Sequence, residues 1–217
     1  MSTVLAFFDM DYTVLDTSSS LEYVKHLRGQ KRLGARLLLH IAWWTLMYKA
    51  SAVDMNRAAP KLLSYIDEVS ASHLMAESYA WFDQRLKAHI TPRAIELIQA
   101  HRQQEHHVVL ISASTQFAVQ PVAEQLHIDF ICSQLVVVDD RMTGEVVEPA
   151  CYGAGKVTWA QRYADEYNAA LSAAYFYTDS HSDRPLLELV GHPIVVNPDA
   201  RLKRMAHQRS WPIEKFY

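Results

Sequence analysis

Cysteine is scarce in this sequence, and its two cysteines lack the spacing of metal ligands. Cys132 and Cys151 are the only ones among 217 residues. A small secreted domain held together by disulfides is therefore not indicated. The N-terminus also lacks the basic region, apolar core and small-residue cleavage site of a signal peptide. We therefore expect a reduced, cytoplasmic protein.

An excess of positive charge is missing as well. Lysine and arginine together number 21 against 24 aspartate and glutamate residues, which gives a formal net charge of -3. Nucleic acid is therefore not expected as the main partner. The sequence also contains no internal repeat and no low-complexity tract, and its length suits one domain with or without an insertion.

No apolar run is long enough to span a membrane. The most apolar stretch, residues 33–49, contains two adjacent tryptophans and is expected to be a helix, but Arg36, His40 and Lys49 interrupt or bound it. A helix that is apolar almost all round needs cover on several sides, so we favour packing inside a helical subdomain. A homodimer contact, an apolar substrate pocket and interfacial contact with a membrane remain as alternatives.

The chain does contain a series of short apolar runs that are typical of buried strands. Residues 4–8 combine β-branched and aromatic side chains, which indicates a strand buried on both faces, as in a parallel sheet. Similar runs occupy residues 107–111, 130–132, 174–177 and 193–196, and a β-hairpin is predicted over residues 135–147 with its turn at 139–144. Predicted helices lie between them and begin near Thr91, Gln116, Gly153, Pro185 and Asp199. The alternation predicts an α/β fold with a Rossmann-like, doubly wound parallel sheet.

One region departs from this alternation. Residues 17–89 show helical spacing and no convincing strand. Ser19, with Glu22 three residues later, fits a capping box at the start of the first helix of this region. We therefore predict an α/β core of residues 1–16 and 90–217, and an all-helical insertion of residues 17–89.

Two carboxylates follow the first strand at the point where it ends. Asp9 and Asp11 are two residues apart, so both side chains point the same way on an extended chain. Like charges this close repel each other unless a cation joins them or one takes a proton. The pair suits a Mg²⁺ site in which one carboxylate is a nucleophile and the other an acid and base. Acidic residues also form turns, which is the simpler interpretation of the pair taken alone.

Polar side chains also follow two other predicted strands. Ser112 follows the second strand, and Asp179 and Asp183 follow the strand at 174–177. The carboxyl ends of parallel strands meet at one edge of a sheet, and Lys156, at the start of a helix, can place a cation beside them. Carboxylates, a hydroxyl and a lysine together suit phosphoryl transfer, because they can hold a hard cation, bind phosphate oxygens and form an aspartyl-phosphate.

The chain resembles the haloacid-dehalogenase (HAD) superfamily of hydrolases, in its phosphoserine-phosphatase-like branch, subfamily IB. Four motifs match in order: residues 9–13, Ser112, Lys156 and residues 179–183. The resemblance covers the predicted core, and the helical insertion lies where this branch carries its C1 cap. Tyr12 stands where many relatives carry glycine.

The resemblance implies a catalytic role for four residues and a supporting role for a fifth. Asp9 would be the nucleophile, and Asp11 the general acid and base that protonates the leaving oxygen and then activates water. Ser112 and Lys156 would hold the phosphoryl group, and Thr13 would support the loop.

The resemblance also implies a metal site. Mg²⁺ would be bound by the carboxylates of Asp9 and Asp179 and by the backbone carbonyl of Asp11. Asp183 would either bind the metal as a further ligand or contact the residues that bind it.

The function that follows is that of a phosphoric monoester hydrolase. We expect a Mg²⁺-dependent phosphatase that hydrolyses a small phosphomonoester, such as phosphoserine or histidinol phosphate, through an aspartyl-phosphate. A lipid-phosphate phosphatase is the alternative that residues 33–49 keep open. A non-enzymatic phospho-signalling or binding module is another, because receiver domains also combine aspartates, a hydroxyl and a lysine on a parallel sheet. Specificity is expected from the insertion, with four polar candidates, Ser18, Ser20, Glu22 and Arg57.

Overall fold

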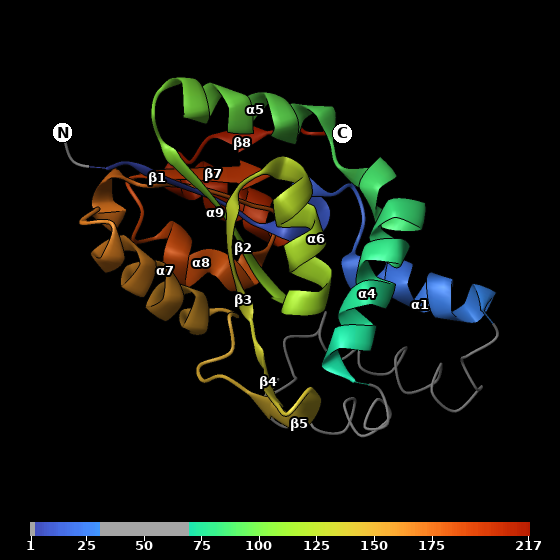
Figure 1. Ribbon diagram of the computed structural model, residues 1–217. Coiled ribbons are helices and arrows are strands. Elements are labelled where there is room, and N and C mark those ends of the chain that lie inside the picture. Colours follow the sequence, from blue (N-terminus) through green and yellow to red (C-terminus); the bar gives the residue numbers. More distant parts are fainter. Residues whose placement is uncertain (1–2, 31–69) are drawn as a thin grey trace.

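The computed structural model describes residues 3–30 and 70–217, which contain a parallel sheet between two layers of helices (Figure 1). The sheet has six strands in the order β3-β2-β1-β6-β7-β8, and every neighbouring pair is parallel. Its strands are β1 (Leu5–Phe8), β2 (His107–Thr115), β3 (Asp129–Ser133), β6 (Tyr175–Thr178), β7 (His192–Val196) and β8 (Ile213–Glu214). The predicted doubly wound α/β fold is therefore confirmed, and only the two-residue β8 was not predicted.

Side chains of β1 alternate between two apolar clusters, one on each face of the sheet. Ala6 and Phe8 belong to the first cluster, and Leu5 and Phe7 belong to the second. All four are fully buried, as the absence of polar residues in this run predicted. Burial of such large side chains contributes roughly 1.5–3 kcal/mol each, so this strand anchors the whole core.

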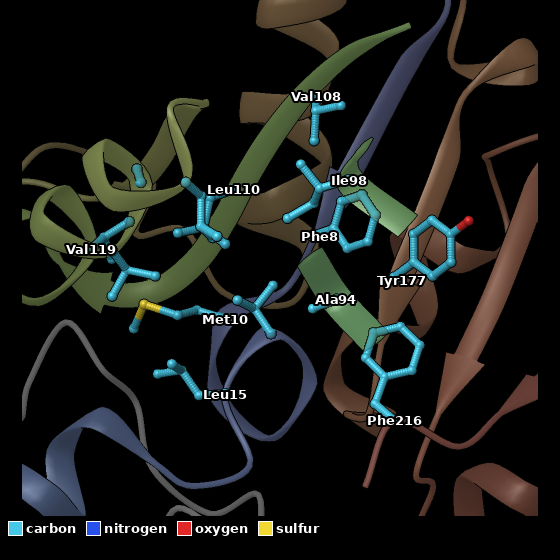
Figure 2. Packing of buried hydrophobic residues seen from close by; sticks show 14 of the residues in the cluster. Phe8, Met10, Leu15, Ala94, Ile98, Val108, Leu110, Val119, Tyr177 and Phe216 are labelled. Atoms are coloured by element: carbon cyan, nitrogen blue, oxygen red, sulfur yellow. The ribbon is translucent and has the colours of Figure 1, made fainter. Parts of the chain in front are cut away.

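Each cluster is completed by helices. On the first face lie α5 (Pro92–Gln103) and α6 (Gln116–Leu126), and on the second lie α7 (Ala154–Glu166), α8 (Arg184–Leu187) and α9 (Ala200–Arg209). Figure 2 shows the first face, where Phe8 and Leu110 of the sheet meet Ile98 of α5 and Val119 of α6. The predicted helix starts near Thr91 and Asp199 are confirmed, since each side chain accepts hydrogen bonds from the backbone of the first turn.

A hairpin of β4 (Leu135–Val138) and β5 (Arg141–Val146) forms a separate two-stranded sheet. The predicted turn at 139–144 is too long, because the actual turn consists of Asp139 and Asp140, both with positive φ. Gly144, expected in that turn, lies inside β5 with a φ of 82°, where the pairing shifts register. The Asp140 carboxylate accepts two hydrogen bonds of 2.7 Å from Ser72, at the start of α4 (Ala71–Trp81).

Two parts of the predicted insertion are described, and both are helical. They are α1 (Ser19–Gly29) and α4, which continues through two short helical turns, Phe82–Leu86 and Lys87–His89. An antiparallel bridge joins Leu15 to Ile90, so the two ends of the predicted insertion lie side by side. The helix expected at residues 33–49 lies outside the described residues, and the division into core and insertion stays a prediction. Among the helices of the described ranges, none is both long and apolar enough to cross a membrane.

Candidate active site

The loop after β1 turns back on itself and is tied to the neighbouring strand. Backbone hydrogen bonds from Val14 to Asp9 (3.2 Å) and from Leu15 to Met10 (2.9 Å) close the turn. Thr13 is fully buried, and its hydroxyl accepts a hydrogen bond of 3.0 Å from the Asp179 backbone N–H after β6. Thr13 therefore fixes the distance between the two acidic loops that the sequence places at the ends of adjacent strands.

Tyr12 takes up an unusual backbone conformation within this loop. Its φ is 56°, in the left-handed region that glycine adopts most easily. A non-glycine residue there costs of order 1 kcal/mol. The tyrosine therefore keeps the backbone shape of the loop and adds a side chain that is 37% exposed.

Lys156 joins the two acidic loops. Its ammonium donates to Asp9 Oδ1 at 2.8 Å and to Asp183 Oδ2 at 2.6 Å, and only 2% of the residue is exposed. The Thr178 hydroxyl, at the end of β6, donates to the same Asp183 oxygen at 2.7 Å. The structure thus brings together residues that are 147 positions apart in the sequence.

Burial and mutual repulsion control the charges of these carboxyl groups. Burial raises the pKa of Asp9 to about 7, with Lys156 acting against this and Asp183 and Asp11 adding to it. Burial, followed by the charges of Asp9 and Asp183, raises the pKa of Asp179 well above its usual value. Burial disfavours the charged form of Lys156, yet Asp183 and Asp9 outweigh it and raise its pKa. One lysine therefore neutralises only part of the negative charge that ionised carboxylates would bring here.

This donor set fits a hard divalent cation such as Mg²⁺, which prefers carboxylate and carbonyl oxygens. A cation at Asp9 and Asp179 would supply the positive charge that Lys156 alone does not supply. Across residues 3–30 and 70–217, no three side chains of histidine, cysteine, aspartate or glutamate form a metal-binding group. The Mg²⁺ site that we predict is not such a group of three side chains, because one of its ligands is the backbone carbonyl of Asp11.

The Asp11 carboxylate points towards α1. Its Oδ1 accepts from the Ser19 backbone N–H at 2.7 Å, and its Oδ2 accepts from the hydroxyls of Ser19 and Ser114, both at 3.1 Å. Burial raises the pKa of Asp11, against the effect of these hydrogen bonds. The predicted capping box is wrong, because Ser18 is the N-cap and Glu22 accepts instead from Lys25 and Thr17.

Ser112 and Ser114 lie together at the carboxyl end of β2. The strand continues past the predicted end at residue 111 and shifts register after Ser112. Ser112 is 1% exposed, and its hydroxyl accepts a hydrogen bond of 3.1 Å from the Ser114 backbone N–H. We did not predict Ser19 and Ser114 as site residues, although the spacing of Ser112 and Ser114 placed both on one side of the strand.

The four specificity candidates are only partly described. Ser18 and Ser20 form a hydrogen bond of 2.8 Å with each other at the surface. Glu22 is 3% exposed and accepts a hydrogen bond of 2.6 Å from Lys25. Arg57 lies outside the described residues.

Replacing Gly155 by alanine is expected to destabilise the protein by about 3 kcal/mol and to slow turnover, because Lys156 is the next residue. An added Cβ would lie 1.9 Å from the backbone oxygen of Ala150. Thermal unfolding and initial rates would measure both effects. Gly29→Ala is the control, since its Cβ would be 3.7 Å from the nearest atom, and alanine in this helix should leave stability unchanged or raise it by up to about 1 kcal/mol. Equal behaviour of the two variants would contradict the prediction.

Three proteins of known sequence and one solved structure are similar to this chain. A probable phosphatase of Mycobacterium tuberculosis is 32% identical over 97% of this chain and 75% of its own length. A phosphoserine phosphatase of the same organism is 29% identical over 99% of this chain and 71% of its own. A histidinol-phosphatase of Neisseria meningitidis is 28% identical over 98% of each chain. The structure of a protein of unknown function from Bordetella pertussis has a TM-score of 0.91 at 25% identity and covers 100% of both chains.

The family is identified by a match to a family profile. A profile of haloacid dehalogenase-like hydrolases matches residues 6–188, which include all four motifs and the strands that carry them. The expected resemblance is therefore confirmed at the level of both sequence and fold. The chain belongs to the haloacid dehalogenase-like hydrolase family.

Proposed function

We propose that this protein is a Mg²⁺-dependent phosphatase that hydrolyses a small phosphomonoester through an aspartyl-phosphate at Asp9. The observation that carries the proposal is the buried ammonium of Lys156, which contacts Asp9 and Asp183 at 2.8 and 2.6 Å. A buried lysine beside a carboxylate favours its ionised form, which is the form that attacks phosphorus. The same positive charge can stabilise the charge on a transferring phosphoryl group.

The first half of the reaction transfers the phosphoryl group to the protein. An oxygen of the Asp9 carboxylate attacks phosphorus, and the bond from phosphorus to the leaving oxygen breaks. The Asp11 carboxyl gives its proton to that oxygen, so the product leaves as an alcohol. Burial raises the pKa of Asp11, which favours the protonated form that this step requires.

The second half returns the protein to its starting state. The Asp11 carboxylate, now without its proton, takes one from a water molecule, whose oxygen attacks the phosphorus of the aspartyl-phosphate. The acyl–phosphate bond breaks, inorganic phosphate leaves, and the Asp9 carboxylate is restored. Lys156 and the Ser112 hydroxyl would hold the phosphoryl oxygens in both halves.

Mg²⁺ would be held by the carboxylates of Asp9 and Asp179 and by the Asp11 backbone carbonyl. When bound, it would offset the negative charge of the phosphoryl group and the carboxylates. The hydrogen bond from Asp179 to Thr13 would orient the Asp179 loop for this role. Asp183 accepts from Lys156 and Thr178, so its role would be to hold Lys156 rather than to bind the metal directly.

The substrate class follows from the relatives and from the predicted division of the chain. Relatives named phosphoserine phosphatase and histidinol-phosphatase support a small phosphorylated metabolite with an alcohol leaving group. Residues 17–89 would form a cap over the leaving group and determine specificity, above the core of residues 1–16 and 90–217.

A panel of phosphomonoesters should show Mg²⁺-dependent phosphate release, with the highest kcat/KM for a small polar substrate of the phosphoserine or histidinol phosphate kind. The measurement is phosphate release in excess Mg²⁺ and again in EDTA. A preference for a lipid phosphate would replace the substrate class. A panel without any phosphate release, together with stable phosphorylation of the protein, would replace the enzyme with a phospho-signalling module.

A further inference from the structure

We propose that Ser19 and Ser114 are positioning residues that aim the Asp11 carboxyl at the leaving oxygen of the substrate. The inference rests on the proposed function, since it assigns Asp11 the acid and base role. Three donors from these two serines contact Asp11, at 2.7 Å for the Ser19 backbone N–H and 3.1 Å for each hydroxyl. The two hydroxyls are also 3.1 Å from each other, so each can donate either to Asp11 or to the other hydroxyl.

These hydrogen bonds restrain both the rotation of the Asp11 side chain and the rotation of its carboxylate plane. Oδ1 and Oδ2 have separate donors, so neither rotation of the side chain nor a flip of the carboxylate plane leaves the three bonds intact. Ser19 is 1% exposed, and water competes poorly for donors that are buried to this degree. An acid and base must be held within about 0.5 Å of its productive position, and hydrogen bonds of this kind supply that accuracy.

The donors also suit both protonation states that the reaction needs. A backbone N–H can only donate, so Oδ1 of Asp11 remains an acceptor throughout. When Oδ2 is protonated, a hydroxyl of Ser19 or Ser114 can still donate to its remaining lone pair, which leaves the proton available for the leaving oxygen. The same two residues can therefore hold the side chain as an acid in the first half-reaction and as a base in the second.

The two serines come from different parts of the fold. Ser114 lies on β2, within the sheet, while Ser19 is the first residue of α1, in the predicted insertion. Asp11 takes the place of a helix cap, because the N-cap residue Ser18 makes no capping hydrogen bond with its own side chain. Any shift of α1 relative to the sheet therefore changes the direction of the Asp11 carboxyl.

The test compares substrates with poor and good leaving groups. In Ser114→Ala, kcat/KM for the best alkyl phosphate of the panel should fall about 10- to 100-fold, because an alcohol leaves only with a proton from Asp11. For 2,4-dinitrophenyl phosphate, whose leaving group needs no proton, the fall should be about 3-fold or less. Ser19→Ala should show the same selective loss, and Ser114→Thr, which keeps the hydroxyl, should restore most of the alkyl phosphate activity.

Ser78→Ala is the matched control. Ser78 is also a buried serine, 2% exposed, and its hydroxyl bonds to the backbone oxygen of Leu74 within α4. It should show no difference between the two substrates, whatever its effect on the melting temperature. Equal losses on both substrates in Ser114→Ala and Ser19→Ala, or no loss, would overturn the positioning role while wild-type activity stands. Absence of any wild-type phosphatase activity would overturn the proposed function itself, and this inference with it.

Discussion

Asp9→Asn should lower phosphate release by at least about 10³-fold, because an amide cannot attack phosphorus as a carboxylate does. The exchange keeps the size of the side chain and leaves an oxygen or nitrogen within reach of Lys156. Protein folding should therefore survive, and the loss should appear in kcat. Phosphate release under saturating substrate and Mg²⁺ is the measurement, with wild-type protein from the same preparation beside it. Near wild-type turnover would exclude Asp9 as the nucleophile.

The same variant should change how stability depends on pH in EDTA. The folded-state pKa of Asp9 is raised from 3.8 to about 7, so between these values the folded protein binds more protons than the unfolded one. Stability should therefore decrease as pH rises through this range, and Asp9→Asn should remove that part of the decrease. Melting temperatures at pH 5 and pH 8 would measure it. An identical pH dependence in the variant would contradict the raised pKa.

The fold was predictable because its signals are local. A run such as residues 4–8 has no polar position, which only a strand covered on both faces tolerates, and β1 is fully buried in the structure. Parallel strands then place their carboxyl ends at one edge of the sheet. Asp9 and Asp183 consequently lie on either side of Lys156, although no local pattern links the three.

The capping box failed because another carboxylate, that of Asp11, accepts hydrogen bonds from the same serine. Ser19 and Glu22 have the correct spacing, but the turn after β1 brings the Asp11 carboxylate to the start of α1. The Ser19 backbone N–H and hydroxyl both donate to Asp11, and Glu22 accepts from Thr17 and Lys25 instead. A pattern of four residues contains no information about an acceptor eight positions earlier.

The hairpin turn shows a second limit of local patterns. The predicted turn included Gly144, and glycine is the commonest residue with positive φ. In the structure Asp139 and Asp140 adopt positive φ instead, at 49° and 62°. Asp140 is held there by its two hydrogen bonds to Ser72, a contact that depends on the tertiary fold.

Lys156→Met should destabilise the protein by about 3–5 kcal/mol in EDTA, as loss of one partner from a buried ion pair does. Methionine fills much of the same volume but leaves the Asp9 and Asp183 carboxylates, both within 2.8 Å of the ammonium, without their counter-charge. Turnover should fall by about 10³-fold, since the phosphoryl group loses a fixed positive charge. Urea unfolding in EDTA and phosphate release in Mg²⁺ measure the two effects.

Lys87→Met is the control for an exposed pair. Lys87 lies 3.7 Å from Asp83, and their side chains are 50% and 69% exposed, so this variant should lose less than about 1 kcal/mol. The destabilisation by Lys156→Met should also depend on pH. Without the ammonium, the pKa of Asp9 rises further, so at pH 5 the carboxyl takes a proton and the repulsion with Asp183 disappears. The variant should therefore lose more stability at pH 8 than at pH 5, whereas an equal loss at both would mean that lost packing, and not charge, explains it.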